Sequence, residues 1–144
     1  MTGAYIPPFL RQQVMADFGR QCAYCHTLTA ITGARLVVDH ILPEVAGGET
    51  IRENLCPACH SCNEFKGKQT KAVDPKTGAM VALFNPREQS WRIHFQWSFD
   101  GGEVMGMTEI GRATVIALKM NHPEIVDARR RWALVGWHPP DEDK

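Results

Sequence analysis

The chain has 144 residues, 44% of them hydrophobic, and a formal net charge of zero, which suits one domain with one core. No apolar run approaches the roughly 18 residues that a membrane-spanning helix needs, so we expect no membrane association. The N-terminus lacks a basic segment followed by an apolar one, so we expect no signal peptide and a cytoplasmic location.

The first half of the chain predicts helix, strand, loop and helix in that order. Two prolines open an apolar run with helical spacing over residues 7–18, and Gly19 ends it. A short β-branched run predicts a strand over residues 36–41. Proline and paired glycines predict a loop over residues 43–48, and residues 58–68 suit a second helix.

The second half predicts a linker, a hairpin and two helices. Residues 69–80 contain a turn sequence and are expected to cross the surface. Apolar and polar residues alternate over 91–99, which is typical of a half-buried strand, and the turn at 100–102 folds it into a hairpin. Helices are expected over residues 108–120 and 123–135, so the chain as a whole is expected to be an α+β protein.

The aromatic strand allows two interpretations. The residues on its apolar face could stack on nucleobases, but such a face is more commonly part of the core, which we favour. These residues are Trp91, Ile93, Phe95, Trp97 and Phe99. On the opposite face, Arg92 and His94 could contact DNA, although a solvated face is the commoner explanation.

Four of the five cysteines form two CxxC pairs, namely Cys22 with Cys25 and Cys59 with Cys62. In a reducing compartment, two such pairs favour a tetrahedral zinc site, because each short turn directs two thiolates at one point. The alternative is a redox pair with separate buried thiols.

The fifth cysteine, Cys56, forms a further CxxC spacing with Cys59. A site that used Cys56 would leave Cys62 without a role, so we interpret Cys56 as a packed thiol. His60 is a weaker substitute ligand.

The order of these features resembles the HNH endonucleases. After the first CxxC pair come Asp39-His40 at a strand end, a proline and Gly-Gly loop, and Asn54; Asn63 and Lys66 follow the second pair. The resemblance covers residues 22–66. It implies a ββα-metal core with a four-cysteine zinc site in residues 1–70. Residues 71–144 would add the hairpin and two helices, packed on the core, and 84–139 are similar to an extension of uncharacterised bacterial HNH proteins.

The resemblance also implies the chemistry, which is metal-dependent hydrolysis of DNA phosphodiester bonds. His40 would be the general base, since an imidazole can accept a proton near neutral pH. Asn54 would brace the histidine, and Asp39 and Asn63 would hold one divalent ion. Many family members have histidine where this chain has Asn63; an amide oxygen favours Mg²⁺ or Mn²⁺.

DNA is the expected partner, and the basic residues that could contact phosphates are Lys66, Lys68, Lys71, Arg129 and Arg130. Each has a simpler interpretation as a solvated surface residue or the wet side of a helix. Because the net charge is zero, we expect modest DNA affinity concentrated on one face.

Taken singly, the candidate catalytic residues also have ordinary interpretations. His40 could be structural and Asp39 a turn former, while Asn54 and Asn63 could cap helices. Their joint order favours the nuclease. The alternative is a non-catalytic zinc module that binds nucleic acid or a protein, for which neither Asp39 nor His40 would be needed. The sequence predicts neither the oligomeric state nor the cleavage specificity.

Overall fold

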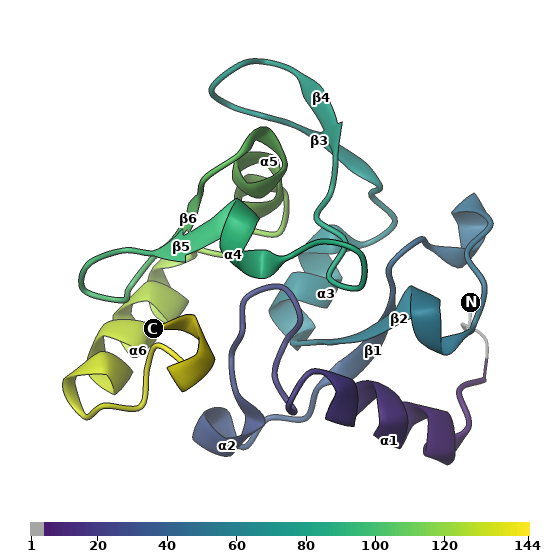
Figure 1. Cartoon of the computed structure of the whole chain (residues 1–144), viewed down its shortest axis with the longest axis horizontal. Coiled ribbons are helices and arrows are strands. Elements are labelled where there is room, and N and C mark those ends of the chain that lie inside the picture. The colour runs from purple at the N-terminus through teal and green to yellow at the C-terminus, as the bar shows by residue number, and fades with distance from the viewer. Residues whose placement is uncertain (1–4) are drawn as a thin grey trace. The chain divides into compact units, whose positions relative to one another are not determined.

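The computed structural model describes residues 5–144 (Figure 1). Residues 1–4 lie outside the described residues. They begin the N-terminal segment in which the sequence predicts no signal peptide. The chain divides into two compact units, Met1–Thr70 with Asn85–Glu88, and Lys71–Phe84 with Gln89–Lys144. None of the helices in the described part of the chain has the length and apolarity that a bilayer crossing requires.

The first unit contains the expected ββα arrangement. Its elements are α1 (Pro8–Asp17), α2 (Thr29–Thr32), β1 (Val37–His40), β2 (Leu55–Ala58) and α3 (His60–Lys66), with short 3-10 helices at Glu44–Ala46 and Arg52–Asn54. Strands β1 and β2 pair antiparallel, with Asp39 opposite Cys56 and His40 opposite Leu55. Helix α3 follows β2 and packs against both strands, which confirms the predicted fold of this core.

Helix α1 begins and ends where the sequence predicts. Pro8 occupies its first turn, where the missing amide hydrogen costs nothing, and Gly19 adopts a positive φ of 65° just beyond its end. Val14 and Met15 are its buried residues, whereas Phe9, expected on the apolar face, is exposed.

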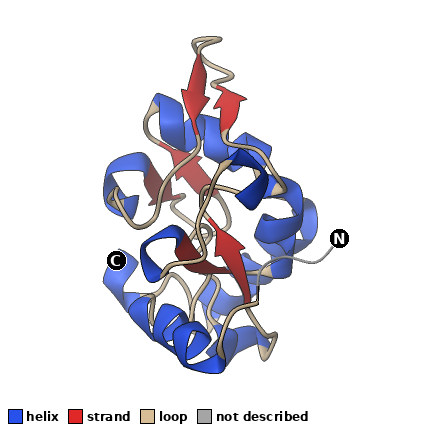
Figure 2. Cartoon of the chain, turned by 90° about the vertical axis from the view of Figure 1, so that its right-hand side faces the viewer, coloured by secondary structure: helices blue, strands red, loops and turns tan. Residues whose placement is uncertain are grey.

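The second unit contains β3 (Lys71–Val73), β4 (Met80–Ala82), α4 (Trp91–His94), β5 (Phe95–Trp97), β6 (Val104–Gly106), α5 (Glu109–Ala117), α6 (Pro123–Leu134) and a 3-10 helix at Asp141–Asp143. The hairpin β5–β6 and the helices α5 and α6 confirm the predicted hairpin and the two predicted C-terminal helices. The strands of the described residues form three separate two-stranded sheets (Figure 2).

The prediction of a linker over residues 69–80 is wrong, because this segment belongs to an antiparallel hairpin of β3 and β4. Asp74, in its turn, is fully buried and accepts two hydrogen bonds from Arg112 of α5, at 2.9 and 2.8 Å. This ion pair lowers the pKa of Asp74 well below its usual value. Asp74 also accepts from the Lys76 amide and the Thr77 hydroxyl within the turn, so local hydrogen bonds and a partner distant in sequence together order it.

The strand predicted over residues 91–99 is wrong in its first half, where α4 forms a helical turn. Trp91, Phe95 and Trp97 are buried, which confirms the core interpretation for these three side chains. Ile93 and Phe99 are exposed. The helical turn changes the side-chain period from two to about 3.6 residues, so Ile93 does not share a face with the tryptophans.

Arg129, a predicted phosphate contact, is 1% exposed in the core of the second unit, so this prediction is wrong. Its Nη1 donates to the carbonyl of Gly102 at 3.1 Å and to Oδ1 of Asn121 at 3.2 Å. Its guanidinium lies over the ring of Trp97, 5.2 Å from the centroid. The amphipathic pattern of α6 assigns Arg129 to the wet face, but these contacts compensate for burying its charge.

Candidate active site and metal centre

The two CxxC pairs converge in the first unit. The sulfur atoms of Cys22, Cys25, Cys59 and Cys62, the cysteine cluster, all lie within 4.8 Å of one another. The Cys25 and Cys59 sulfurs are 3.8 Å apart. A tetrahedral zinc site with bonds of about 2.3 Å has sulfur–sulfur edges of about 3.8 Å. The cluster therefore could bind a zinc ion.

Each pair is organised by its own backbone. The amide of Cys25 donates to Sγ of Cys22 at 3.5 Å, and the amide of Cys62 donates to Sγ of Cys59 at 3.3 Å. Burial raises the pKa of the Cys22 thiol well above its usual value. Burial therefore favours the neutral thiol unless a cation lies among the sulfurs, and Zn²⁺ is the ion that four cysteine ligands suit.

Cys56 and His60 lie apart from this cluster. Cys56 is fully buried on β2, with its sulfur 4.0 Å from Oδ2 of Asp39, which confirms the interpretation as a packed thiol. His60 is exposed on α3 and does not belong to the cluster, so its use as a substitute ligand finds no support.

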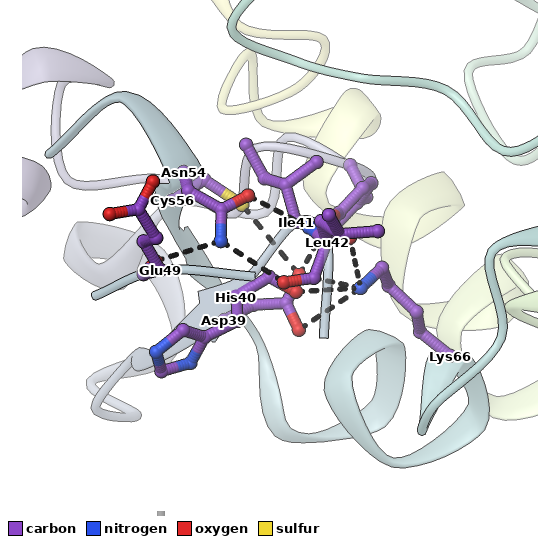
Figure 3. Close-up of polar contacts among 9 residues, drawn as sticks. Asp39, His40, Ile41, Leu42, Glu49, Asn54, Cys56 and Lys66 are labelled. Carbon is purple, nitrogen blue, oxygen red and sulfur yellow. Dashed lines mark hydrogen bonds and ion pairs between the residues drawn. The ribbon is translucent and has the colours of Figure 1, made fainter. Parts of the chain in front are cut away.

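His40 ends β1 with its side chain mostly buried, and in Figure 3 its ring points away from the carboxylate of Asp39. Its Nε2 lies 2.9 Å from the hydroxyl of Thr50 and 4.0 Å from Oε1 of Glu44. Thr50 is a residue that the sequence analysis missed. It matches no motif position and becomes a neighbour of His40 only when the loop turns back.

Asn54 holds this loop closed. Its side-chain oxygen accepts from the amide of Leu42 at 2.9 Å, and its Nδ2 donates to the carbonyls of Leu42 and Glu49 at 3.0 and 2.9 Å (Figure 3). Its backbone carbonyl accepts from the amide of Ile41 at 2.9 Å. Asn54 therefore braces the loop after His40, whereas the hydrogen bond to the ring comes from Thr50.

Gly48 allows the loop to pack this closely. A side chain there would overlap the carbonyl oxygen of Leu42 and crowd the amide of Asn54. The second glycine of the predicted Gly-Gly loop, Gly48, is thus required because its backbone lies close to the carbonyl of Leu42.

Asp39 is buried on the other side of β1. Its Oδ2 accepts from the Tyr24 hydroxyl at 2.7 Å and lies 3.1 Å from Nζ of Lys66. Burial raises the pKa of Tyr24 well above its usual value, so the phenol stays protonated and acts as the donor. Tyr24 was also missed, although a buried tyrosine hydroxyl usually requires a partner and its neighbours in the sequence are metal-ligand candidates.

Lys66 is 1% exposed, so the prediction that it contacts phosphate from the surface is wrong. Besides Asp39, its ammonium group donates to the carbonyls of His40 and Ile41 at 3.0 and 3.1 Å (Figure 3). A buried ammonium requires such a set of acceptors. Lys66 therefore fastens α3 to the end of β1 and partly neutralises Asp39.

Asp39, His40 and Asn63 line one recess of about 300 Å³, together with Glu44 and Lys68. We call it the His40 recess. Carboxylate and amide oxygens are the donors that Mg²⁺ and Mn²⁺ prefer, and Mg²⁺ needs few of them because it retains water ligands. Although Lys66 reduces the negative charge of Asp39, its contact with Oδ1 is the longer one, at 3.4 Å. The donor set therefore fits a weakly held hard cation.

The remaining basic candidates differ in setting. Lys68 is exposed at the His40 recess, and Lys71 is exposed on β3. Arg130 is exposed but paired with Asp100 at 2.8 Å.

A second hollow, which the sequence did not predict, is a groove of about 570 Å³ lined by Arg11, Arg20, Arg35 and residues of the start of β1 and α3. We call it the arginine groove. Among the described residues, none of these three arginines has a carboxylate partner.

Comparison with known proteins finds similarity in the segment that carries the cysteine cluster and the His40 recess. The family described as HNH endonuclease matches residues 22–69. The CRISPR-associated endonuclease Cas9 of Corynebacterium diphtheriae is 44% identical over 64 residues, which cover 44% of this chain; the chain spans about 6% of the length of that curated relative. No solved structure matches the chain. The segment that matches the HNH endonuclease family, residues 22–69, therefore carries the cysteine cluster, Asp39, His40 and Asn63.

Proposed function

We propose that this protein is a metal-dependent endonuclease that hydrolyses phosphodiester bonds of DNA. The observation that carries the proposal is the meeting of Asp39, His40 and Asn63 in one recess, within the segment that matches the HNH family. Phosphodiester hydrolysis needs a base for the water nucleophile and a positive charge beside the phosphate. A histidine and two oxygen ligands supply the groups for both tasks.

His40 is the proposed general base. In the neutral tautomer with hydrogen on Nε2, the ring donates to the Thr50 hydroxyl at 2.9 Å, which leaves Nδ1 as the proton acceptor. Thr50 thereby fixes the orientation of the ring. Asn54 and Gly48 act one step further away, because they hold the loop that carries Thr50.

Asp39 and Asn63 are the proposed ligands of one Mg²⁺ or Mn²⁺ ion. Such an ion, when bound, stabilises the negative charge that develops on the phosphate and on the leaving oxygen. The partial neutralisation of Asp39 by Lys66 supports weak binding, so millimolar metal would be needed. The cysteine cluster is the proposed site of a separate structural Zn²⁺ ion.

The arginine groove is the proposed path of the DNA backbone. Val37, at the start of β1, lines the arginine groove. His40, at the end of the same strand, lines the His40 recess. Three strand residues span about 10 Å, so one nucleic-acid strand could lie along both hollows. Lys68, at the recess, and the three arginines of the groove would then contact successive phosphates.

One observation favours the non-catalytic alternative, namely a zinc module that binds nucleic acid or a protein. The carboxylate of Asp39 already has an ammonium partner in Lys66, 3.1 Å away. A purely structural Asp39 would have the same surroundings. The two functions differ in whether zinc-loaded protein cuts DNA.

The test is incubation of the zinc-loaded chain with supercoiled plasmid in millimolar Mg²⁺ or Mn²⁺, with single-stranded DNA and RNA in parallel. We expect nicked or linear plasmid, no reaction when the added Mg²⁺ or Mn²⁺ is left out while the zinc content stays unchanged, and no reaction by His40→Ala. DNA binding without cleavage in either metal would establish the non-catalytic alternative. Cleavage of RNA but not DNA would correct the substrate.

A further inference from the structure

Tyr24 joins the two parts of the first unit that carry metal-ligating groups. It lies between Cys22 and Cys25 in the sequence, and its side chain is fully buried. Its hydroxyl donates to Oδ2 of Asp39 at 2.7 Å, the shortest contact of that carboxylate among the described residues. One short turn therefore supplies two sulfur atoms to the cysteine cluster and a hydrogen bond to the candidate catalytic carboxylate.

We propose that Tyr24 is a positioning residue that couples the cysteine cluster to the catalytic metal site by fixing the carboxylate of Asp39. This inference rests on the proposed function. It assigns the cysteine cluster a task in catalysis beyond stabilising the fold, since the same turn that binds the structural ion orients a ligand of the catalytic ion.

The turn that carries Tyr24 is fixed at both ends. The amide of Cys22 donates to the carbonyl of Thr27 at 3.0 Å, and the amide of His26 donates to the carbonyl of Cys22 at 2.9 Å. The amide of Ala23 donates to the carbonyl of Pro57 on β2 at 2.9 Å. The base of the Tyr24 side chain is thus attached to the strand that pairs with β1, on which Asp39 lies.

The two oxygens of Asp39 are engaged unequally. Among the described residues, Oδ2 has the Tyr24 hydroxyl at 2.7 Å, the Lys66 ammonium at 3.1 Å and the Cys56 sulfur at 4.0 Å, whereas Oδ1 has only the Lys66 contact at 3.4 Å. Tyr24 therefore selects one carboxylate orientation and leaves Oδ1 as the oxygen with capacity for a further cation. Without the hydroxyl, rotation of the carboxylate would be opposed by Lys66 and by the long contact with the Cys56 thiol.

The first test is Tyr24→Phe, which retains the buried ring and removes only the hydroxyl. On the zinc-loaded full chain, the Mn²⁺ dissociation constant is measured by electron paramagnetic resonance of free Mn²⁺. Loss of a residue that orients a metal ligand typically weakens metal binding about 10- to 100-fold, which is the result we expect. The zinc content should stay at the wild-type value. Tyr5→Phe, which removes an exposed hydroxyl, is the matched control and should bind Mn²⁺ as the wild type does.

The second test asks whether Tyr24 acts through Asp39. In an Asp39→Asn background, Tyr24→Phe should produce no further change in Mn²⁺ affinity. In urea unfolding the two substitutions should be non-additive, by about tenfold in the unfolding equilibrium constant.

The outcomes separate the two proposals. If the wild type cleaves DNA and binds Mn²⁺ while Tyr24→Phe does both equally well with its zinc intact, the coupling is overturned and the nuclease function stands. If the wild type neither cleaves nor binds Mn²⁺, the nuclease function fails, and the catalytic coupling fails with it. Weaker Mn²⁺ binding of Tyr24→Phe with a lost zinc ion would also overturn the coupling, because the hydroxyl would then serve the fold only.

Discussion

The hydroxyl of Thr50 lies 2.9 Å from Nε2 of His40 and is the closest polar group to that ring among the described residues. Thr50→Val keeps the shape of the side chain and removes this partner. We expect kcat for plasmid cleavage to fall about 10- to 100-fold with little change in KM, because the ring loses the hydrogen bond that fixes its orientation but the DNA contacts remain. Thr50→Ser retains the hydroxyl and should keep most of the activity. Equal loss in both variants would mean that Thr50 serves only loop packing.

Lys66→Met leaves Asp39 as a buried carboxylate without its cation. We expect the free energy of unfolding to fall by about 3–5 kcal/mol, as measured by urea unfolding of zinc-loaded protein. Lys68→Met, two residues further along and exposed, is the matched control and should change stability by less than about 0.5 kcal/mol. Similar effects of the two substitutions would contradict the buried ion pair.

Replacing Cys22 and Cys59 with serine should abolish zinc binding, measured as zinc per chain by elemental analysis. Loss of the ion should also unfold the first unit, because structural zinc contributes about 10–16 kcal/mol in small domains, more than a typical total stability. Cys56→Ala removes a buried thiol outside the cluster and should leave the zinc content unchanged. Wild-type protein without zinc, or a zinc loss in Cys56→Ala, would show that the cluster is assigned wrongly.

The part of the fold that short-range patterns specify could be predicted from the sequence. Helix α1 lies between a proline and a glycine, and β1 is a β-branched run that ends in the Asp39-His40 motif. The cysteine cluster was predictable because the spacing within each pair determines where its sulfurs point. The β3–β4 hairpin was not, since its turn is ordered in part by Arg112, a residue far away in the sequence.

Side-chain roles that depend on tertiary packing were less predictable. Lys66 and Arg129 both carry positive charge at positions that a helical pattern assigns to the surface, yet each is buried among acceptors from another element. Motif spacing placed Asp39, His40 and Asn63 together correctly, because the motif records groups that converge in one recess. Thr50 and Tyr24 occupy no position of the motif, so only their hydrogen bonds to His40 and Asp39 reveal their roles.

If the arginine groove carries DNA, replacing Arg20 and Arg35 with alanine should weaken duplex binding similarly for all sequences. Each lost phosphate contact should lower the slope of log affinity against log salt concentration by about 0.9, so we expect a decrease of about 2. Fluorescence anisotropy with the inactive His40→Ala chain measures this. Arg131→Ala, an exposed arginine paired with Asp127, should leave the slope unchanged. An unchanged slope in the groove variant would place the DNA elsewhere.

The most direct test of the central claim compares His40→Ala with Asp39→Asn in plasmid cleavage over a range of Mg²⁺ and Mn²⁺ concentrations. Asparagine at position 39 keeps an oxygen acceptor for Lys66, and zinc content and melting temperature verify that both variants are folded. A weakened metal ligand is offset by mass action, so Asp39→Asn should recover activity as the metal concentration rises. His40→Ala should remain about 100- to 10,000-fold slower at every metal concentration, because no cation replaces a proton acceptor. Cleavage by His40→Ala at the wild-type rate would contradict the assignment of the recess as the active site.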